Sequence, residues 1–335
     1  MKAQEVLRLA KACLQDDSLT ERSVSTRRVC SLWSGMGSIY ELRINNRLHV
    51  AVKHVPAANP KEMKDFGERR KAVAYQVEGN FYEHAAPHFP TLRLPQLYHI
   101  ERSENSITLC LEWMSGPRYS SSSRVEDALT WLATLHSESW GRADALVASC
   151  GLHAQGTYWH LDTRPEEHAQ MSSTGWEGRL KRAARAIHDA LERDVMQCIV
   201  HGDVKEPNLL LDPDGGVTMC DFQYTGKGSP TQDLAYFFCS SVDTEECDEE
   251  QLLEHYHKIL TQKLVDQSAI PSWDHLQLSM DLAYCDFCRF MSGWGYWGSV
   301  DIIQSRVQAV LNRIDNGKDL GSEEAYDAAI RNHFW

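Results

Sequence analysis

The chain has 335 residues, of which 42% are hydrophobic and 24% are charged, a composition typical of a globular protein of about two domains or lobes. This composition excludes a wholly disordered, collagen-like or coiled-coil chain. The formal net charge is −13, and an acidic surface repels phosphate groups, so we expect neither nucleic acid nor a membrane as a partner.

The N-terminal segment shows no signal for export or membrane insertion. Residues 1–14 are interrupted by charges and predict a short amphipathic helix, not an apolar signal sequence. We therefore expect a cytoplasmic protein whose ten cysteines are reduced thiols. Cys285 and Cys288 form a lone CxxC pair. A metal or redox role would need a second ligand pair, so buried helix positions are the simpler interpretation.

The first third of the chain is typical of an antiparallel sheet with one helix. Runs rich in β-branched and aromatic residues predict strands at 29–33, 39–44, 48–55 and 107–113. Short turns separate the first three runs, as in a meander. Residues 61–84 are charged with spaced apolar positions and predict a helix.

The sequence changes character near residue 115. Residues 115–117 and the serines at 120–123 predict a flexible break. Beyond it, helical periodicity predicts helices over 125–137, 178–193, 248–264 and 275–291, and short strands at 197–200, 209–211 and 217–220. The prediction is an α+β fold with a small β-rich N-lobe (1–111), a hinge (112–118) and a larger, mainly helical C-lobe (119–335).

Segment 199–223 holds the residues on which a chemical role can be based. Asp203, Asn208 and Asp221 flank a predicted β-hairpin whose apolar strands place the two carboxylates at adjacent strand ends. Phosphoryl transfer uses such a set: one carboxylate accepts the proton of the attacking hydroxyl, while a carboxylate and an amide oxygen hold Mg²⁺. The alternative is an Asp-rich turn between core strands. It would explain either Asp203 with Asn208 or Asp221 alone, but it explains their combination less well.

His201-Gly-Asp203 with Asn208, followed by Asp221-Phe-Gln223, resembles the catalytic and metal motifs of the aminoglycoside phosphotransferase and choline kinase superfamily. The resemblance implies a bilobal, protein-kinase-like fold. It implies a kinase that uses ATP and Mg²⁺ to phosphorylate a hydroxyl of a small metabolite, such as a choline-like amino alcohol, a sugar, an aminoglycoside or a sterol-like alcohol. Asp203 would be the catalytic base, and Asn208 and Asp221 would bind Mg²⁺.

The same resemblance assigns residues of the N-lobe to ATP. Lys53, in a predicted strand, would hold the α and β phosphates, and a helical glutamate would orient it. Glu78 fits best, although Glu68 and Glu83 lie on the same predicted helix. The other implied ATP contacts are backbone groups of a glycine turn and of the hinge, at Gly35, Met36, Gly37, Ser38, Glu112, Trp113 and Met114. The glycine turn could also be an ordinary hairpin turn with no role in ATP binding.

The region around the metal motif separates small-molecule kinases from protein kinases. Lys205, two residues after Asp203, would contact the transferring phosphoryl group or form a surface salt bridge. The segment after Asp221 soon reaches a predicted helix start capped by Asp233, and it contains no Ala-Pro-Glu. This pattern is similar to the choline-kinase-like branch that includes the ecdysteroid kinase-like proteins. A pseudokinase scaffold and, more remotely, a protein kinase remain the alternatives.

Acceptor recognition is expected in the helices that follow Asp221. The candidate contacts are Asp286, Arg289, Trp294 and Trp297. In residues 291–299, three glycines alternate with large aromatic residues. Such a segment can form a cage for a quaternary ammonium group or a platform for a sugar or sterol ring. An aromatic plug in the core is an equal alternative.

Overall fold

A computed structural model describes residues 1–32, 35–45, 47–56, 65–103, 106–117, 119–243 and 247–334. The chain forms two compact units, one made of Met1–Arg118 with Leu210–Gln223 and the other of Tyr119–Leu209 with Tyr224–Trp335. A chain segment from the middle of the sequence thus joins the N-terminal unit. The predicted lobe boundaries at 111 and 118 stay a prediction.

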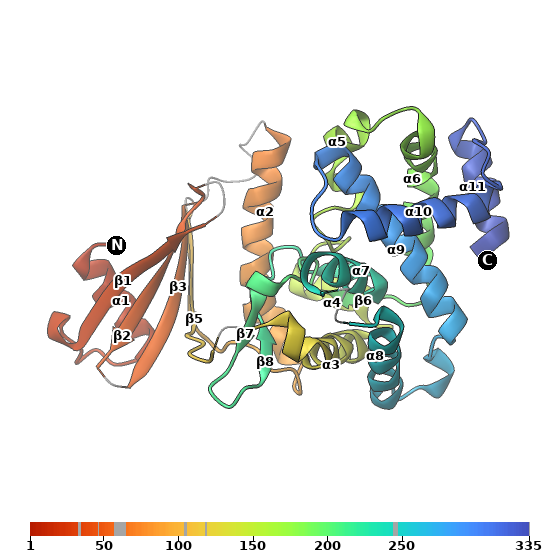
Figure 1. The fold of residues 1–335 in the computed structure, drawn as a ribbon. Coiled ribbons are helices and arrows are strands. Elements are labelled where there is room, and N and C mark those ends of the chain that lie inside the picture. Colours follow the sequence, from red (N-terminus) through yellow and green to blue (C-terminus); the bar gives the residue numbers. More distant parts are fainter. Residues whose placement is uncertain are drawn as a thin grey trace. The chain divides into compact units, whose positions relative to one another are not determined.

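The N-terminal unit is built on a five-stranded antiparallel sheet in the order β1-β2-β3-β5-β4. Figure 1 labels β1, β2, β3 and β5 of this sheet. Its strands are β1 (Val24–Ser31), β2 (Ser38–Ile44), β3 (Leu48–Pro56), β4 (Leu97–Ser103) and β5 (Ser106–Glu112). Its helices are α1 (Ala3–Leu14) and α2 (Phe66–Asn80), followed by a π-helical turn at Phe81–Ala85 and a 3₁₀ turn at Ala86–His88. A further 3₁₀ turn, Glu21–Ser23, precedes β1.

The central strands match the prediction, and the edge strands do not. β1 begins at Val24, five residues earlier than predicted, and β4 was not predicted. Both strands lie at edges of the sheet, and β1 is almost entirely exposed. An exposed edge strand needs no alternation of apolar and polar residues, so its sequence lacks the signal on which the prediction depended. The start of the predicted helix, at 61–64, falls outside the described residues.

Helix α1 completes the core of this unit. Its apolar stripe of Val6, Leu9 and Ala10 packs against Ile44 and Val50 of the sheet. The predicted amphipathic helix is therefore confirmed, and it covers one face of the sheet. The hairpin β7 (Leu209–Leu211) and β8 (Val217–Met219) forms a separate two-stranded sheet.

The C-terminal unit is mainly helical. Its helices are α3 (Ser121–Ser139), α4 (Ala143–Cys150), α5 (Pro165–Gln170), α6 (Gly175–Arg193), α7 (Pro230–Ser241), α8 (Glu249–Lys263), α9 (Trp273–Trp294), α10 (Val300–Asp315) and α11 (Glu323–Phe334). It also contains the strand pair β6 (Cys198–Val200) and β9 (Gly226–Gly228), and 3₁₀ turns at Leu161–Thr163, Glu206–Asn208 and Gln267–Ala269. The long helix α9 packs against α5, α6, α7 and α10.

Two local predictions in this unit are wrong. The serines at 120–123 do not form a flexible break, because α3 begins at Ser121, with a kink at Arg124. Asp233 does not cap α7, because the helix starts earlier: Ser229 is its N-cap and forms a capping box with Gln232.

Cys285 and Cys288 are buried and free on α9, and burial raises the pKa of Cys288 to about 12.

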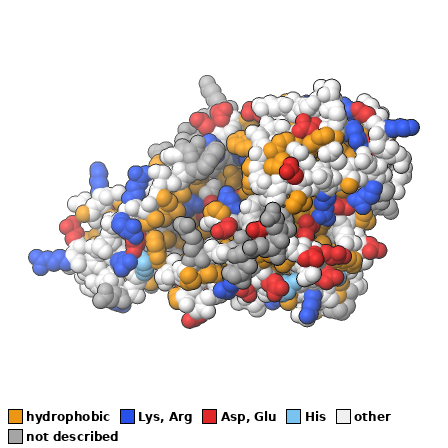
Figure 2. All heavy atoms as spheres, viewed as in Figure 1, with side chains coloured by type: hydrophobic (Ala, Val, Ile, Leu, Met, Phe, Trp, Pro, Cys, Tyr) orange, Lys and Arg blue, Asp and Glu red, His pale blue; other side chains and the backbone are white. Residues whose placement is uncertain are grey.

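On the face shown in Figure 2, acidic and basic side chains are interspersed. Among the described residues, no helix combines the length and the apolar character needed to cross a membrane.

Candidate active site

In the N-terminal unit, a buried lysine lies between two carboxylates. Lys53 is on β3, which is flanked by β2 and β5, and its side chain is buried in the sheet. The Lys53 ammonium lies 2.9 Å from Oε1 of Glu78 on α2 and 2.8 Å from Oδ1 of Asp221. Of the three candidate glutamates, Glu78 is the one that reaches Lys53, whereas Glu83 pairs with Arg102.

In this trio the Lys53 cation attracts both carboxylates, while Asp221 and Glu78 repel each other. Burial alone would lower the pKa of Lys53, but the negative charges of Asp221 and Glu78 outweigh it and raise that pKa above its usual value. Burial raises the pKa of Glu78 to about 7, against the attraction of Lys53. Lys53 is therefore a permanent cation, which suits contact with phosphate.

Asp221 adopts a backbone conformation that is unusual for a residue other than glycine. Its φ is +69°, and such strained positions are common in functional sites. The next residue, Phe222, is buried and stacks on Phe81 with ring centroids 3.7 Å apart. The side-chain amide of Gln223 donates to Oδ1 of Asp221 at 2.6 Å. The Asp-Phe-Gln segment is thus anchored by its aromatic residue, while Asp221 remains partly exposed.

The glycine turn is closed by its own backbone. A Cβ on Gly37 would lie 2.4 Å from the carbonyl oxygen of His54, so this position requires glycine, whereas the φ of +71° at Gly35 favours glycine in open surroundings. The N–H of Leu32 donates to Gly37, and that of Gly35 donates to Leu32. Ser38 starts β2, and its hydroxyl accepts from Arg28 at 3.1 Å.

The predicted hinge is partly engaged within its own unit. The Glu112 N–H donates to the carbonyl of Gln96, and that of Trp113 donates to His49, on which the indole also stacks at 4.8 Å. The Glu112 carboxylate pairs with Arg93, which also approaches the sulfur of Met114. An adenine contact at this hinge would have to use backbone groups other than these two N–H donors.

In the C-terminal unit, Asp203 is held at the centre of a hydrogen-bond network. It is buried in the loop that follows β6. Its Oδ2 accepts from the ammonium of Lys205 at 2.8 Å and from the amide nitrogen of Asn208 at 3.1 Å. Its Oδ1 accepts from the hydroxyl of Tyr236 at 3.1 Å. Because the side-chain nitrogen of Asn208 donates to Asp203, the side-chain oxygen of Asn208 is the atom that could bind a cation.

Asp233 fixes the backbone of this loop from inside the unit. Its carboxylate accepts from the N–H groups of His201 at 2.7 Å and Gly202 at 2.9 Å, and lies 3.2 Å from Nε2 of His136. The roles of Asp233 and Tyr236 were not predicted from sequence. Their spacing of three residues, which places both on one face of α7, is the signal that could have indicated them.

The four candidate acceptor residues do not form one group. Asp286 and Arg289 are fully buried on α9 and pair with each other at 2.8 Å. Trp294 is exposed and lies under the guanidinium of Arg164. Of the four, Trp297 is the residue that approaches the Asp203 network, because its ring packs edgewise on Tyr236 at 5.8 Å.

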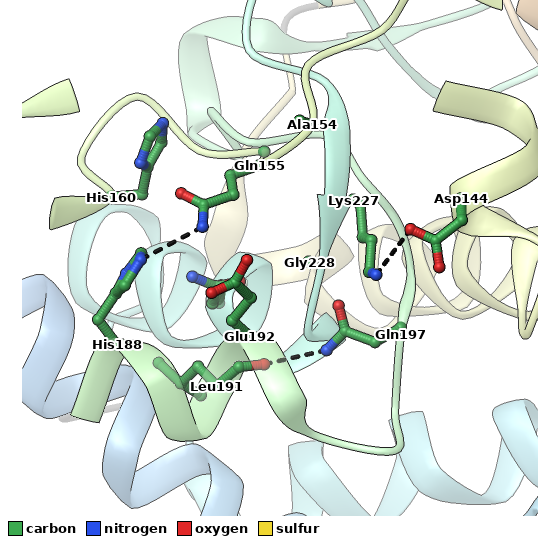
Figure 3. Close-up of a pocket in the computed structure, with 12 residues that line it drawn as sticks. Asp144, Ala154, Gln155, His160, His188, Leu191, Glu192, Gln197, Lys227 and Gly228 are labelled. Atoms are coloured by element: carbon green, nitrogen blue, oxygen red, sulfur yellow. Dashed lines mark hydrogen bonds and ion pairs between the residues drawn. The ribbon is translucent and has the colours of Figure 1, made fainter. Parts of the chain in front are cut away.

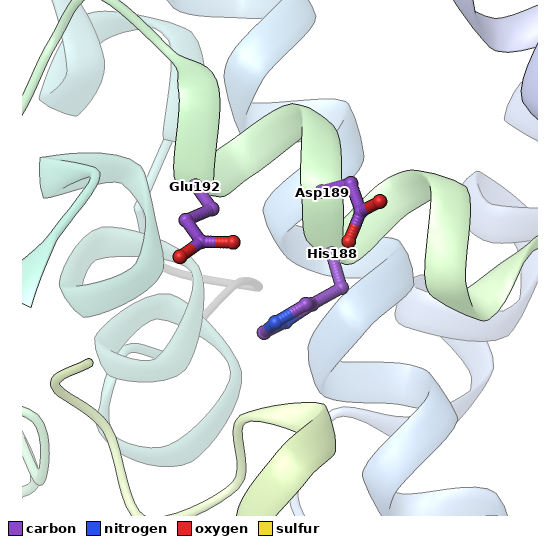
Figure 4. Close-up of side chains that lie close together, drawn as sticks. All are labelled: His188, Asp189 and Glu192. Atoms are coloured by element: carbon purple, nitrogen blue, oxygen red, sulfur yellow. The ribbon is translucent and has the colours of Figure 1, made fainter. Parts of the chain in front are cut away.

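A separate pocket of about 210 Å³ lies in the same unit (Figure 3). Its polar groups largely pair among themselves: Gln155 contacts His188 at 3.3 Å and Lys227 pairs with Asp144 at 2.7 Å. On α6, His188 lies near Asp189 and Glu192 (Figure 4). Asp189 also pairs with Arg193 at 3.2 Å. His188 and Asp189 are thus already paired with neighbouring side chains. This argues against a stable metal site, which needs about four ligands.

The antiparallel sheet of one unit and the helices of the other define an α+β protein. The sequence matches the phosphotransferase enzyme family over residues 40–261, more than half of the chain. The protein therefore belongs to this family, which confirms the resemblance and the fold class predicted from sequence. No curated protein sequence matches the chain.

Several solved kinases share the fold. An amicoumacin kinase in complex with AMP-PNP and Ca²⁺ has a TM-score of 0.57 at 11% identity, covering 93% of this chain and 94% of its own. An ethanolamine kinase from Plasmodium vivax has a TM-score of 0.53 at 12% identity, covering 88% and 84%. The choline kinase LicA from Streptococcus pneumoniae has a TM-score of 0.52 at 14% identity, covering 98% of each chain. At these identities the likeness concerns the fold.

Proposed function

We propose that this phosphotransferase is an ATP-dependent kinase that phosphorylates a hydroxyl of a small molecule. The observation that carries the proposal is the network around Asp203, in which a buried carboxylate is held by Lys205 and Asn208. This is the arrangement expected of a base that accepts the proton of an attacking hydroxyl. The proton moves to Asp203, the new bond forms between the acceptor oxygen and the γ-phosphorus, and ADP leaves.

The other assigned residues would bind the nucleotide and the metal. Lys53, oriented by Glu78, would contact the α and β phosphates, and Lys205 would stabilise charge on the transferring group. The oxygens of Asp221 and Asn208 are hard donors and suit Mg²⁺, which would neutralise charge on the phosphates. These groups act mainly by position and charge, as phosphoryl transfer requires.

The acceptor is proposed to be a small alcohol and not a protein. The chain between Asp221 and α7, which begins at Pro230, is short and contains no Ala-Pro-Glu, so it offers no platform for a peptide. Trp297 lies beside Tyr236, which contacts Asp203. An aromatic ring at this place favours an acceptor that has an apolar face beside its hydroxyl.

A phosphoryl-transfer screen tests this function. Purified protein, Mg²⁺ and ATP are mixed with pooled hydroxyl compounds, namely choline, ethanolamine, aminoglycosides, sugars, sterols and a metabolite extract. Mass spectrometry then detects new phosphorylated species. Asp203→Asn serves as the blank, and Asp189→Asn, which changes an acidic residue on α6, is the matched control. We expect a product from the wild type and from Asp189→Asn that is absent with Asp203→Asn.

Other outcomes would overturn the proposal. The same product from Asp203→Asn would remove Asp203 from the reaction. Binding of MgATP with no product from any pool would favour a nucleotide-binding scaffold, and labelling confined to added proteins would favour a protein kinase.

A further inference from the structure

The pocket of about 210 Å³ in the C-terminal unit has no part in the assigned kinase roles (Figure 3). None of the residues that line it is assigned to the nucleotide, the metal or the acceptor. Drug-sized ligands occupy pockets of about 300–1,000 Å³. The volume of this pocket therefore suits a smaller molecule.

One wall of the pocket is held in place by backbone hydrogen bonds. The N–H of Gly156 donates to the carbonyl of Lys227 on β9 at 2.7 Å, and the N–H of Lys227 donates to the carbonyl of His153 at 3.2 Å. A Cβ on Gly156 would lie 2.3 Å from a methyl carbon of Val200 on β6, so this segment packs tightly against the strand pair. A wall that is already ordered reduces the entropy that a ligand loses on binding.

The pocket carries a surplus of negative charge. The Lys227 ammonium and the Asp144 carboxylate neutralise each other at 2.7 Å. The Glu192 carboxylate faces the pocket (Figure 3), and in the described part of the chain no hydrogen bond or ion pair engages it. Burial and the neighbouring His188 lower the pKa of His160 to about 3, so this imidazole adds no positive charge near neutral pH.

The amide side chains of the lining leave acceptor atoms available. The nitrogen of Gln155 donates to Nε2 of His188 at 3.3 Å, and the nitrogen of Gln197 donates to the carbonyl of Leu191 at 3.0 Å. Among the described residues, no donor reaches the side-chain oxygen of either glutamine. Together with the carboxylate of Glu192, these oxygens form a set of acceptors that a ligand can use.

Donors in the lining are fewer. The Lys227 ammonium is partly occupied by Asp144. The side-chain oxygen of Gln232 accepts from the N–H of Ser229 at 3.1 Å, which leaves the Gln232 nitrogen as a donor. These two groups allow the ligand one polar oxygen, but most of its polar atoms must be donors.

We infer that this pocket is a second binding site, and that it takes a small organic cation whose nitrogen carries several N–H groups, as in a primary ammonium or guanidinium ion. Such a group can donate to the Glu192 carboxylate and to the glutamine oxygens together. A quaternary ammonium has no N–H to donate, and an anion would be repelled by Glu192. A metal ion fits less well, because His188 and Asp189 are paired with neighbours.

The site is distinct from the acceptor site, although it shares a chain segment with the loop of Asp203. Gln155 and His160 line the pocket. Between them, the N–H of Tyr158 donates to the carbonyl of Gly202 at 3.3 Å. A bound cation would therefore rest against the segment that supports this loop. Its binding can be measured without nucleotide or turnover, so the inference does not depend on the proposed function.

An NMR titration with two small probes tests the site. Methylguanidine and propylamine carry the expected cationic groups and no hydroxyl, so neither is an alcohol acceptor. Tetramethylammonium has the same charge and no N–H. The full chain with ¹⁵N-labelled glutamine side chains is titrated at low ionic strength, where charge attraction is screened least. The signals of Gln155 and Gln197 are identified by their absence from Gln155→Met and Gln197→Met. We expect both signals to shift saturably with methylguanidine or propylamine and not with tetramethylammonium.

Substitutions locate the bound probe. Glu192→Gln should weaken binding about fivefold, because it removes the charge that attracts the cation. Glu254→Gln is the matched control: Glu254 is exposed on α8 and does not line the pocket, so the same loss of charge should leave the affinity unchanged. Ala154→Phe changes an exposed position of the lining and should block binding by filling the pocket without altering its charge.

Several results would overturn the inference. One is an unchanged affinity in Glu192→Gln, or in Ala154→Phe should the first variant fail to fold. Another is tetramethylammonium that binds as tightly as methylguanidine, or glutamine signals that do not respond to either probe. Asp203→Asn should bind the probes like the wild type, because Asp203 does not line the pocket. Binding lost in that variant would place the probes in the acceptor site instead.

Discussion

At the residue scale, the loop that carries Asp203 depends on a position that only glycine can occupy. Gly202 has φ +82°, and a Cβ there would lie 2.2 Å from the carbonyl oxygen of Tyr224. Its N–H donates to Asp233, and its carbonyl accepts from Tyr158. The close approach of the Tyr224 backbone thus explains why glycine stands between His201 and Asp203. The sequence motif alone does not show this reason.

Gly202→Ala is predicted to destabilise the protein far more than an alanine at a glycine with a similar φ but open surroundings. Gly141 is the control, because its φ is +66° and no neighbouring atom lies within 4 Å of the place that a Cβ would take. Gly141→Ala should lower the free energy of unfolding by about 1 kcal/mol from backbone strain. Gly202→Ala should cost more than about 3 kcal/mol, because the clash is added. Urea unfolding measures both, and equal losses would contradict the argument.

At the element scale, helices are tied together by polar side-chain pairs between distant parts of the sequence. Asp194 follows α6, and His275 is in the first turn of α9. Their side chains meet at 2.8 Å, and Asp194 also accepts from the hydroxyl of Ser279 at 2.6 Å. The pair fixes where α9 begins relative to the end of α6.

This pair predicts a pH-dependent stability. The hydrogen bond to Asp194 raises the pKa of His275, although burial opposes the effect. A group whose pKa is raised on folding stabilises the protein fully below its unfolded pKa of about 6.5, and that stabilisation is lost as the pH rises through the folded pKa. His275→Gln should therefore lower the free energy of unfolding by about 1 kcal/mol near pH 5.5 and by less near pH 9.

Urea unfolding at the two pH values checks this prediction. The control is the same substitution in an Asp194→Asn background, where the partner of His275 is no longer charged and the pH dependence should largely disappear. Equal losses near both pH values in the otherwise wild-type protein would contradict the assigned pair.

At the scale of the whole molecule, the assigned residues belong to both compact units. Lys53, Glu78 and Asp221 lie in the N-terminal unit, and Asp203 and Asn208 lie in the C-terminal unit. A ligand that binds only the folded chain stabilises it in proportion to the logarithm of its concentration. The thermal stability of the intact protein therefore reports on nucleotide binding without requiring the acceptor.

MgATP is predicted to raise the unfolding temperature of the full chain. At about 100 times its Kd, a ligand adds about 2.7 kcal/mol, which corresponds to a rise of several degrees. ATP without Mg²⁺ should have a smaller effect, and Asp221→Asn should remove the difference between the two conditions. Asp212→Asn, at the turn of the same hairpin, should behave as the wild type. A Mg²⁺ effect that survives in Asp221→Asn would contradict the metal role.

The sequence alone determined the features that depend on local pattern. The amphipathic α1, the long helices α6, α8 and α9, the central strands and the β7–β8 hairpin follow from periodicity and turn residues. The motif around Asp203 and Asp221 indicated the family, because phosphoryl transfer requires particular residue types at close spacing. Tertiary structure decided the rest. The edge strand β1 extends five residues beyond the run that predicted it, and β4 was not predicted, because both depend on pairing with a neighbouring strand. Helix packing decided the contacts of Tyr236 and Asp233 with the Asp203 loop, and the pairing of Asp286 with Arg289. These contacts could not be predicted, because no local sequence pattern specifies which distant side chains packing brings together or which way a buried side chain faces.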